Sequence, residues 1–382
     1  MINIQFPTTI HISEEGLISL AEHLKATSKR CFVVTGGART QNTPLFQSVL
    51  YELKEALVPY ELFTGIVSNP LSEDILRGAK AFRDGKFDSI VTVGGGSSHD
   101  SGKLIAVLGR QNWDMEQLTV EEAGYSKITE DVAPFYCVPL LAGTGSEISP
   151  ASLVRLDKHK RIVFSPNMYP RAAYYVPSKM FTEDNDLNCL TAFDAYVQSL
   201  EAYMSASATP WSDMFAYHGM QNAIEGLLAF SASPESIEAR TKLIYAAIQG
   251  LLAVSNSSVG AIHALSDPLS GIFDVHHGSA LAIVAGEVLK LNQRARPERF
   301  AEAAKLFDAP FGRSNAVDDL PKLVAELLDR ICPDWKSHKP KVQLDQALLE
   351  RLVLDSKNPD MEGNPLSLKD EEIADVFKKS LS

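Results

Sequence analysis

Five polar side chains in the second half of the chain have the types and spacing of a metal site. Asp194 and Gln198 lie four residues apart in LTAFDAYVQSLEAYMS, so a helix would place both on one face. His263 and His277 follow fourteen residues apart, with Asp267 one helical turn after the first histidine. A carboxylate with two imidazoles can hold Zn or Fe and leave one position open for substrate, and Gln198 offers a weaker amide oxygen. Taken singly, each residue also has an ordinary explanation, as a surface acid, a polar glutamine or a core histidine.

A glycine-rich turn in the first half could bind a phosphate. In DSIVTVGGGSSHDSGKLIAVL an apolar run ends at Gly94, Gly95 and Gly96, and a helical segment with Asp100 and Lys103 follows. Glycines let a phosphate approach the backbone, and the amides at a helix start favour negative charge. The alternative is a turn that binds nothing. A second loop, AGTGSE at 142–147, could close around the same cofactor, although neither loop has a Walker or G-x-G-x-x-G pattern.

An earlier apolar run, CFVVTGGART, bears on the choice between NAD and NADP. It ends at Gly37 and Arg39 without the acid that often holds a ribose 2′-hydroxyl, whereas an arginine can hold a 2′-phosphate. A solvated arginine in an exposed turn is the alternative. The sequence leaves the choice between NAD and NADP open, and Arg39 slightly favours NADP.

The elements that must position these residues change in character near residue 180. Before it, short β-rich runs alternate with helical segments, a pattern that predicts βαβ units and a parallel sheet. After about residue 183, strand-like runs vanish and long amphipathic segments such as SIEARTKLIYAAIQGLLAVS take over. The sequence therefore predicts an α/β domain over 1–180 and an all-α domain over 181–382.

Composition and charge narrow the class of function. The 36 basic residues against 48 acidic ones give a net charge of -12, which disfavours nucleic acid or an anionic membrane as a partner. The four cysteines lie far apart without a C-x-x-C pair, as in reduced proteins, and no signal peptide or long apolar span is evident. We expect a cytoplasmic protein that acts on a small molecule.

Four ordered motifs resemble those of the iron-containing alcohol dehydrogenase family. The family pattern G-G-G-S-x-x-D-x-x-K is matched at 94–103, P-T-T-A-G-T-G-S-E by PLLAGTGSE at 139–147, and D-A-x-x-H-x-x-E-A-Y by DAYVQSLEAY at 194–203. The pattern H-x-x-x-H-P-L-G with a later H-G is matched by HALSDPLS at 263–270 and by His277 with the glycine after it. The resemblance implies an N-terminal NAD(P)-binding domain of the Rossmann type, a C-terminal helical domain and a divalent metal, Fe or Zn, in the cleft between them.

The resemblance also assigns cofactor residues. It implies that Gly95, Gly96 and Ser97 hold the pyrophosphate, with Asp100 from the same pattern beside them. It adds Asn69, the stretch Leu140, Leu141 to Thr144, and Lys160 or Arg161 in place of a cofactor-side lysine. Leu140 and Leu141 stand where the family usually has threonines, so two hydroxyl contacts to the cofactor are lost.

The family's four metal ligands fall on Asp194, Gln198, His263 and His277, so one histidine has become glutamine. A further family histidine, which takes part in proton transfer, falls on Asp267. We therefore assign catalytic roles to His263 and to Asp267, the latter as a replacement proton relay or a substrate contact. A carboxylate near a dication stays ionised, which favours an acceptor role.

These residues predict an NAD(P)-dependent, metal-assisted alcohol dehydrogenase or carbonyl reductase. The polar residues at 198 and 267 suggest a polyhydroxylated or acidic substrate. The alternatives are a metal-independent reductase of the maleylacetate reductase type, a lyase of the dehydroquinate synthase type, and a non-catalytic nucleotide-binding protein. A homodimer is expected by analogy with the family.

Overall fold

The computed structural model describes residues 6–120, 127–157, 159–313 and 319–382. The chain divides into two compact units. The first comprises Met1–Leu141 and Gly145–Thr182, and the second comprises Ala142–Thr144 and Glu183–Ser382. A three-residue piece of the AGTGSE loop therefore belongs with the second unit, although its neighbours in the chain belong to the first.

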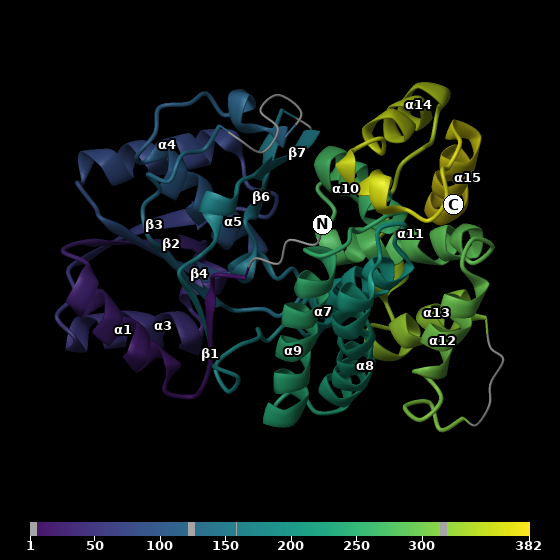
Figure 1. The fold of residues 1–382 in the computed structure, drawn as a ribbon, viewed down its shortest axis with the longest axis horizontal. Coiled ribbons are helices and arrows are strands. Elements are labelled where there is room, and N and C mark those ends of the chain that lie inside the picture. Colours follow the sequence, from purple (N-terminus) through teal and green to yellow (C-terminus); the bar gives the residue numbers. More distant parts are fainter. Residues whose placement is uncertain (1–5, 121–126, 158, 314–318) are drawn as a thin grey trace. The chain divides into compact units, whose positions relative to one another are not determined.

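A six-stranded sheet forms the centre of the first unit (Figure 1). Its strand order is β1-β8-β5-β4-β2-β3 and all its pairs are parallel, which confirms the predicted sheet. The strands are β1 (Thr9–Ile12), β2 (Cys31–Gly36), β3 (Tyr60–Ile66), β4 (Ser89–Gly94), β5 (Phe135–Pro139) and β8 (Ala172–Tyr175). Every residue of β2, β4 and β5 is buried, because helices cover central parallel strands on both faces.

Helices cover the two faces of this sheet (Figure 1). Helices α1 (Gly16–Thr27) and α3 (Pro44–Glu55) pack together on one face, and α4 (Ser72–Asp84) and α5 (Gly96–Leu108) pack together on the other. A short helix, α2 (Ala38–Gln41), follows β2. The start of α3 is set locally, because the Thr43 side chain accepts a hydrogen bond from the Phe46 amide and a proline occupies the first turn.

A β-hairpin that the sequence analysis does not predict follows the AGTGSE loop. Strands β6 (Ala151–Leu156) and β7 (His159–Phe164) pair antiparallel in a separate two-stranded sheet. In β6 the buried side chains are Ser152 and Val154, and because one of them is polar, ASLVRL lacks the alternation of apolar and polar residues that would have predicted a strand. Asp157 directly follows β6 and has a positive φ of 54°, a conformation that aspartate tolerates in turns.

The second unit is helical, and within the described part of the chain no strand follows β8, as predicted. Its helices are α7 (Asn185–Met204), α8 (Pro210–Ala232), α9 (Ile237–Val254), α10 (Ala261–Phe273), α11 (His277–Asn292), α12 (Pro297–Lys305), α13 (Leu320–Ile331), α14 (Gln346–Asp355) and α15 (Asp370–Leu381). Helices α7, α8 and α9 pack on one another, and α11 packs on both α7 and α10.

Helix α7 is the central helix of this unit. Every residue from Asn188 to Met204 is buried, so its polar side chains must find partners inside the protein. The helix begins where the Asp184 carboxylate accepts a hydrogen bond from the Leu187 amide. Among the described residues, no helix is long and apolar enough to cross a membrane.

Candidate active site

Three helices of the second unit bring together an acid and two histidines. Asp194 comes from α7, His263 from the first turn of α10, and His277 is the first residue of α11. One donor atom from each lies within 4.8 Å of the other two. His263 Nε2 is 3.2 Å from Asp194 Oδ1, and His277 Nε2 is 3.8 Å from Asp194 Oδ2. The structure thus gathers three of the four predicted metal ligands around one point.

A close helix contact places His277 in this cluster. A Cβ atom on Gly278 would lie 2.0 Å from the Leu190 carbonyl oxygen of α7, a separation that no side chain tolerates. Glycine therefore lets the start of α11 lie directly against the backbone of α7. Any larger residue would push His277 away from Asp194.

Gln198, the fourth predicted ligand, lies one turn after Asp194 with its amide in a defined orientation. Its Nε2 donates to the Thr144 carbonyl at 3.1 Å and to Asp194 Oδ1 at 3.2 Å. Two acceptors around one end of the amide identify that end as the NH₂ group. The oxygen, Oε1, is buried and has no hydrogen-bond partner among the described residues.

Glu201 orients His263, a role that the sequence analysis did not assign. Its Oε2 lies 2.6 Å from His263 Nδ1, and its Oε1 accepts from the Ile262 amide at 2.6 Å. With Nδ1 held by a carboxylate, Nε2 is the ring nitrogen directed at Asp194, an arrangement common behind metal-binding histidines. The signal was its position three residues after Gln198, on the same face of α7.

In the metal-free protein, Asp194 and Glu201 change the protonation of the His263 imidazole. Burial lowers the pKa of its imidazole, but hydrogen bonds to Asp194 and Glu201, together with their negative charges, outweigh burial and raise the pKa to about 10. The metal-free site therefore holds a proton at neutral pH, where a cation between Asp194 and Glu201 is favoured.

The donor set fits a divalent metal. Asp194 Oδ2 and Gln198 Oε1 are buried oxygens that lack hydrogen-bond partners among the described residues, and leaving such atoms unsatisfied costs about 1–3 kcal/mol each. A cation held by Asp194, His263 and His277 would satisfy Asp194 Oδ2, and the two imidazoles would add nitrogen ligands suited to Fe or Zn.

Asp267 lies one turn after His263 on α10 and is 9% exposed. Its Oδ2 accepts a hydrogen bond from Asn358 Nδ2 at 3.3 Å. His276 precedes α11 as its N-cap residue, and its Nε2 lies 3.4 Å from the Thr191 hydroxyl. His276 thus contacts α7 outside the group formed by Asp194, His263 and His277.

The predicted phosphate turn lies at the carboxyl end of β4 in the first unit. Gly94 has a φ of +152°, and a Cβ there would lie 2.4 Å from the Ser98 hydroxyl oxygen, so only glycine fits. Gly95 is the N-cap of α5, while Gly96 and Ser97 begin the helix. The Leu140 amide donates to the Gly94 carbonyl at 2.8 Å, which brings the two predicted cofactor loops side by side.

Asp100 serves as a structural anchor behind this turn. Its Oδ1 accepts from the Ser146 hydroxyl at 2.6 Å, and its Oδ2 accepts from the Leu153 amide at 3.2 Å. The fully buried Lys103 ammonium lies 3.3 Å from Asp100 Oδ1 and donates to Ser146 at 2.8 Å. Both carboxylate oxygens are thus engaged by the protein, so Asp100 positions the AGTGSE loop and β6 relative to α5.

The other predicted cofactor residues are distributed over loops and the hairpin. Gly37 and Arg39 are exposed at the start of α2, and Asn69 is buried after β3 with a φ of 54°. Leu141 lies beside Gly95, where a Cβ would be 3.6 Å from a Leu141 methyl. Two basic residues lie on β7 opposite β6, namely Lys160 and Arg161, whereas Thr144 belongs to the second unit.

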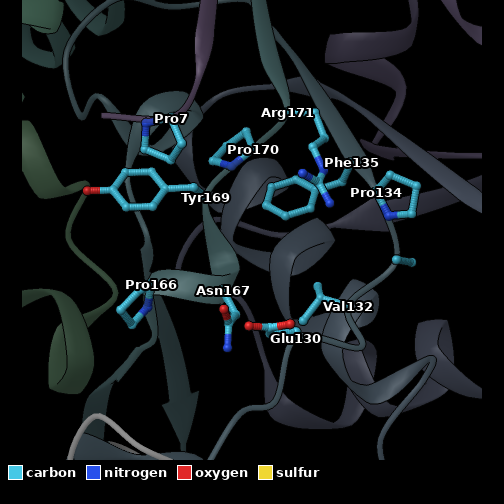
Figure 2. A pocket seen from close by; sticks show the side chains of 11 residues that line it. Pro7, Glu130, Val132, Pro134, Phe135, Pro166, Asn167, Tyr169, Pro170 and Arg171 are labelled. Atoms are coloured by element: carbon cyan, nitrogen blue, oxygen red, sulfur yellow. The ribbon is translucent and has the colours of Figure 1, made fainter. Parts of the chain in front are cut away.

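A cavity of about 460 Å³ lies elsewhere in the first unit (Figure 2). Its wall includes Phe135, the first residue of β5, and Arg171, which immediately precedes β8. The cavity is therefore at the amino ends of the strands, while Gly94 is at a carboxyl end. Nucleotides bind α/β sheets at the carboxyl ends of strands, so this cavity is not the predicted cofactor site.

Two family models match nearly the whole chain. Residues 7–177 match the model described as iron-containing alcohol dehydrogenase, and residues 188–381 match the C-terminal model of the Fe-containing alcohol dehydrogenase family. The chain is 28% identical to 1,3-propanediol dehydrogenase of Klebsiella pneumoniae over 359 residues, which covers 92% of this chain and 91% of that protein.

Further relatives agree with this match. The NAD-dependent methanol dehydrogenase of Bacillus methanolicus is 27% identical over 308 residues, covering 80% of each chain. A crystal structure of a 1,3-propanediol oxidoreductase superposes with a TM-score of 0.86 at 25% identity and covers 100% of both chains.

Proposed function

Because the chain belongs to the iron-containing alcohol dehydrogenase family, we propose that it is a metal-assisted, NAD(P)-dependent alcohol dehydrogenase. The family and its relatives make the chain an oxidoreductase that acts on CH–OH groups. The observation that supports the metal is the Asp194, His263 and His277 cluster, whose donor atoms lie within 4.8 Å of one another and in which the buried Asp194 Oδ2 has no hydrogen-bond partner among the described residues.

Asp194, Gln198, His263 and His277 would hold Fe or Zn, which would act as a Lewis acid on the alcohol or carbonyl oxygen. Glu201 keeps His263 Nε2 directed at Asp194 through the bond to Nδ1. The nicotinamide would exchange hydride with the substrate carbon. The Gly94 to Ser97 turn would bind the pyrophosphate with backbone amides at the start of α5.

For the substrate, we propose a small alcohol with a second hydrogen-bond donor, such as a diol. Asp267 is buried one turn from His263, where a carboxylate would accept a bond from a substrate hydroxyl. An acidic substrate, which the sequence also suggests, would place a second negative charge near Asp267 and is disfavoured. The relatives act on 1,3-propanediol and methanol by name, so small alcohols are the first compounds to test.

The test is removal and return of the metal. Chelator-treated protein should lose oxidation of a 1,3-diol with NAD or NADP, and Fe or Zn should restore it. Gln198→Ala should weaken metal retention about tenfold or more by removing one donor. Gln198→His, which restores the family's ligand, should retain metal at least as well as the wild type. Undiminished turnover in metal-free protein would overturn the Lewis-acid role.

None of the relatives named above supports the alternatives predicted from the sequence. A lyase of the dehydroquinate synthase type regenerates its cofactor in each cycle, so net accumulation of reduced cofactor separates it from a dehydrogenase. A metal-independent reductase would keep its activity after chelation. A non-catalytic binding protein would bind cofactor without turning over any alcohol in the panel.

A further inference from the structure

A second cluster of metal-ligating side chains lies elsewhere in the helical unit. Asp186 is in the first turn of α7, Cys332 is the C-cap of α13, and His338 ends the short 3-10 helix η4 (Trp335–His338). One donor atom from each lies within 4.8 Å of the other two. Tetrahedral zinc ligands lie roughly 3.3–3.8 Å from one another, given Zn bonds of about 2.0–2.3 Å, so small side-chain rotations would bring the three donors onto one ion.

The surroundings of this cluster hold the donor side chains in place and leave a path by which a metal ion could enter from the solvent. Cys332 is fully buried, while Asp186 and His338 are half-buried and reach the solvent. The Ser279 hydroxyl lies 2.9 Å from His338 Nδ1, which fixes the ring in the way that outer partners fix metal-binding histidines. The loop between Cys332 and His338 is anchored where Trp335 Nε1 donates to Asp329 Oδ1 at 2.9 Å.

The thiol of Cys332 has the wrong surroundings for a nucleophile. Burial and then the neighbouring Asp186 carboxylate raise its pKa to about 12, whereas reactive thiols have lowered pKa values beside positive groups. A divalent cation is the ligand class that satisfies a thiol, a carboxylate and an imidazole together. The sulfur donor selects zinc-like ions over Mg²⁺ or Ca²⁺.

We propose that Asp186, Cys332 and His338 form a second metal site suited to Zn²⁺, with water in the fourth position. The site does not depend on the proposed function, because its ligands and chemistry differ from those of the Asp194 cluster. It would fix the start of α7 to the segment that follows α13. Asp194 lies about two turns further along α7, so a metal here would stabilise the helix that carries the catalytic ligands.

The sulfur ligand gives a readout specific to this site. Cobalt bound by a thiolate shows a near-ultraviolet charge-transfer band, and the Asp194 cluster has no sulfur donor. Titration of metal-depleted, reduced, full-length protein with Co²⁺ should produce this band, and Zn²⁺ should abolish it by displacement. The band should persist in His277→Ala, which alters only the Asp194 cluster.

Two variants test the ligands. Cys332→Ser should lose the band, and His338→Ala should weaken cobalt binding about tenfold or more. His338 is half-buried, so its variant should fold even if Cys332→Ser does not. Zn²⁺ should also raise the Tm of the wild type more than that of His338→Ala. The proposal is overturned if excess cobalt gives no band in the wild type, or if His338→Ala binds cobalt with unchanged affinity.

Discussion

At the scale of single residues, the other side chains of the candidate metal site are arranged around Asp194. Each of its two carboxylate oxygens lies nearest to a different histidine, Oδ1 to His263 and Oδ2 to His277. Gln198 adds an amide donor to Oδ1 and leaves its own oxygen without a partner among the described residues. One buried acid therefore lies next to all three of these side chains.

The stability of the metal-free protein should depend on pH through His263. Its folded pKa of about 10 is above the ordinary value of 6.5. The stability that His263 contributes is therefore fully present below pH 6.5 and is lost as the pH rises through about 10. The Tm difference between the wild type and His263→Gln should shrink over this range.

The control is the wild type with metal bound, whose Tm should not show this pH dependence, because a metal replaces the proton on Nε2. His263→Gln is the matched variant, since glutamine keeps hydrogen-bonding capacity and does not titrate. A Tm difference that is constant across the pH range in metal-free protein would contradict the prediction.

At the scale of elements, α7 carries one half of the site, and the first residues of α10 and α11 carry the other. Asp194, Gln198 and Glu201 share one face of a buried helix, so their grouping follows from sequence spacing. His277 reaches that face because α11 packs on α7, and His263 reaches it because Glu201 holds the start of α10 by hydrogen bonds. Two local contacts fix the positions of the two histidines, namely the Glu201 hydrogen bonds to the start of α10 and the close approach of Gly278 to α7.

The turn between β4 and α5 should not tolerate a side chain at Gly94. An alanine Cβ would lie 2.4 Å from the Ser98 hydroxyl oxygen, at a φ of +152°. Gly94→Ala should therefore destabilise the protein by about 1–3 kcal/mol and weaken cofactor binding. Denaturant unfolding and NADH or NADPH fluorescence titration measure the two effects.

Gly16→Ala is the matched control in the same unit. Gly16 begins α1, and a Cβ there would meet only ordinary contacts at 3.9 Å or more. This substitution should leave stability unchanged or slightly higher, because alanine reduces the entropy of the unfolded chain. Equal losses of stability in the two variants would show that strain at Gly94 is not the cause.

At the scale of the whole molecule, the two candidate sites are built by different compact units. The phosphate turn belongs entirely to the first unit, and the metal ligands belong entirely to the second. His277 lies in the second unit, next to Asp194, so His277→Ala should remove metal while leaving NAD(P)H affinity unchanged. Elemental analysis and fluorescence titration of the same sample measure both quantities.

The reciprocal variant completes this test. Gly94→Ala should keep the metal content of the wild type while binding cofactor weakly. Loss of cofactor binding in His277→Ala would contradict the separation of the two binding functions. A loss of both in either variant, with a lowered Tm, would indicate global unfolding, which circular dichroism detects.

Much of this protein can be read from the sequence because the signals are local. Alternating apolar runs predicted the parallel sheet, and the long amphipathic segments predicted the helical second half. The i, i+4 spacing placed Asp194 and Gln198 on one helix face, and four ordered motifs identified the family. These features depend on neighbours in the chain, so the sequence alone determined them.

Only the tertiary structure decided which residues share a site. It left Gln198 Oε1 without a hydrogen-bond donor among the described residues. It also gave Asp100 a structural role and placed Glu201 in hydrogen-bond contact with His263. It also joined Asp186, Cys332 and His338, which are up to 152 residues apart and carry no shared motif. Such groupings depend on how helices pack, and packing is set by the whole buried surface rather than by local spacing.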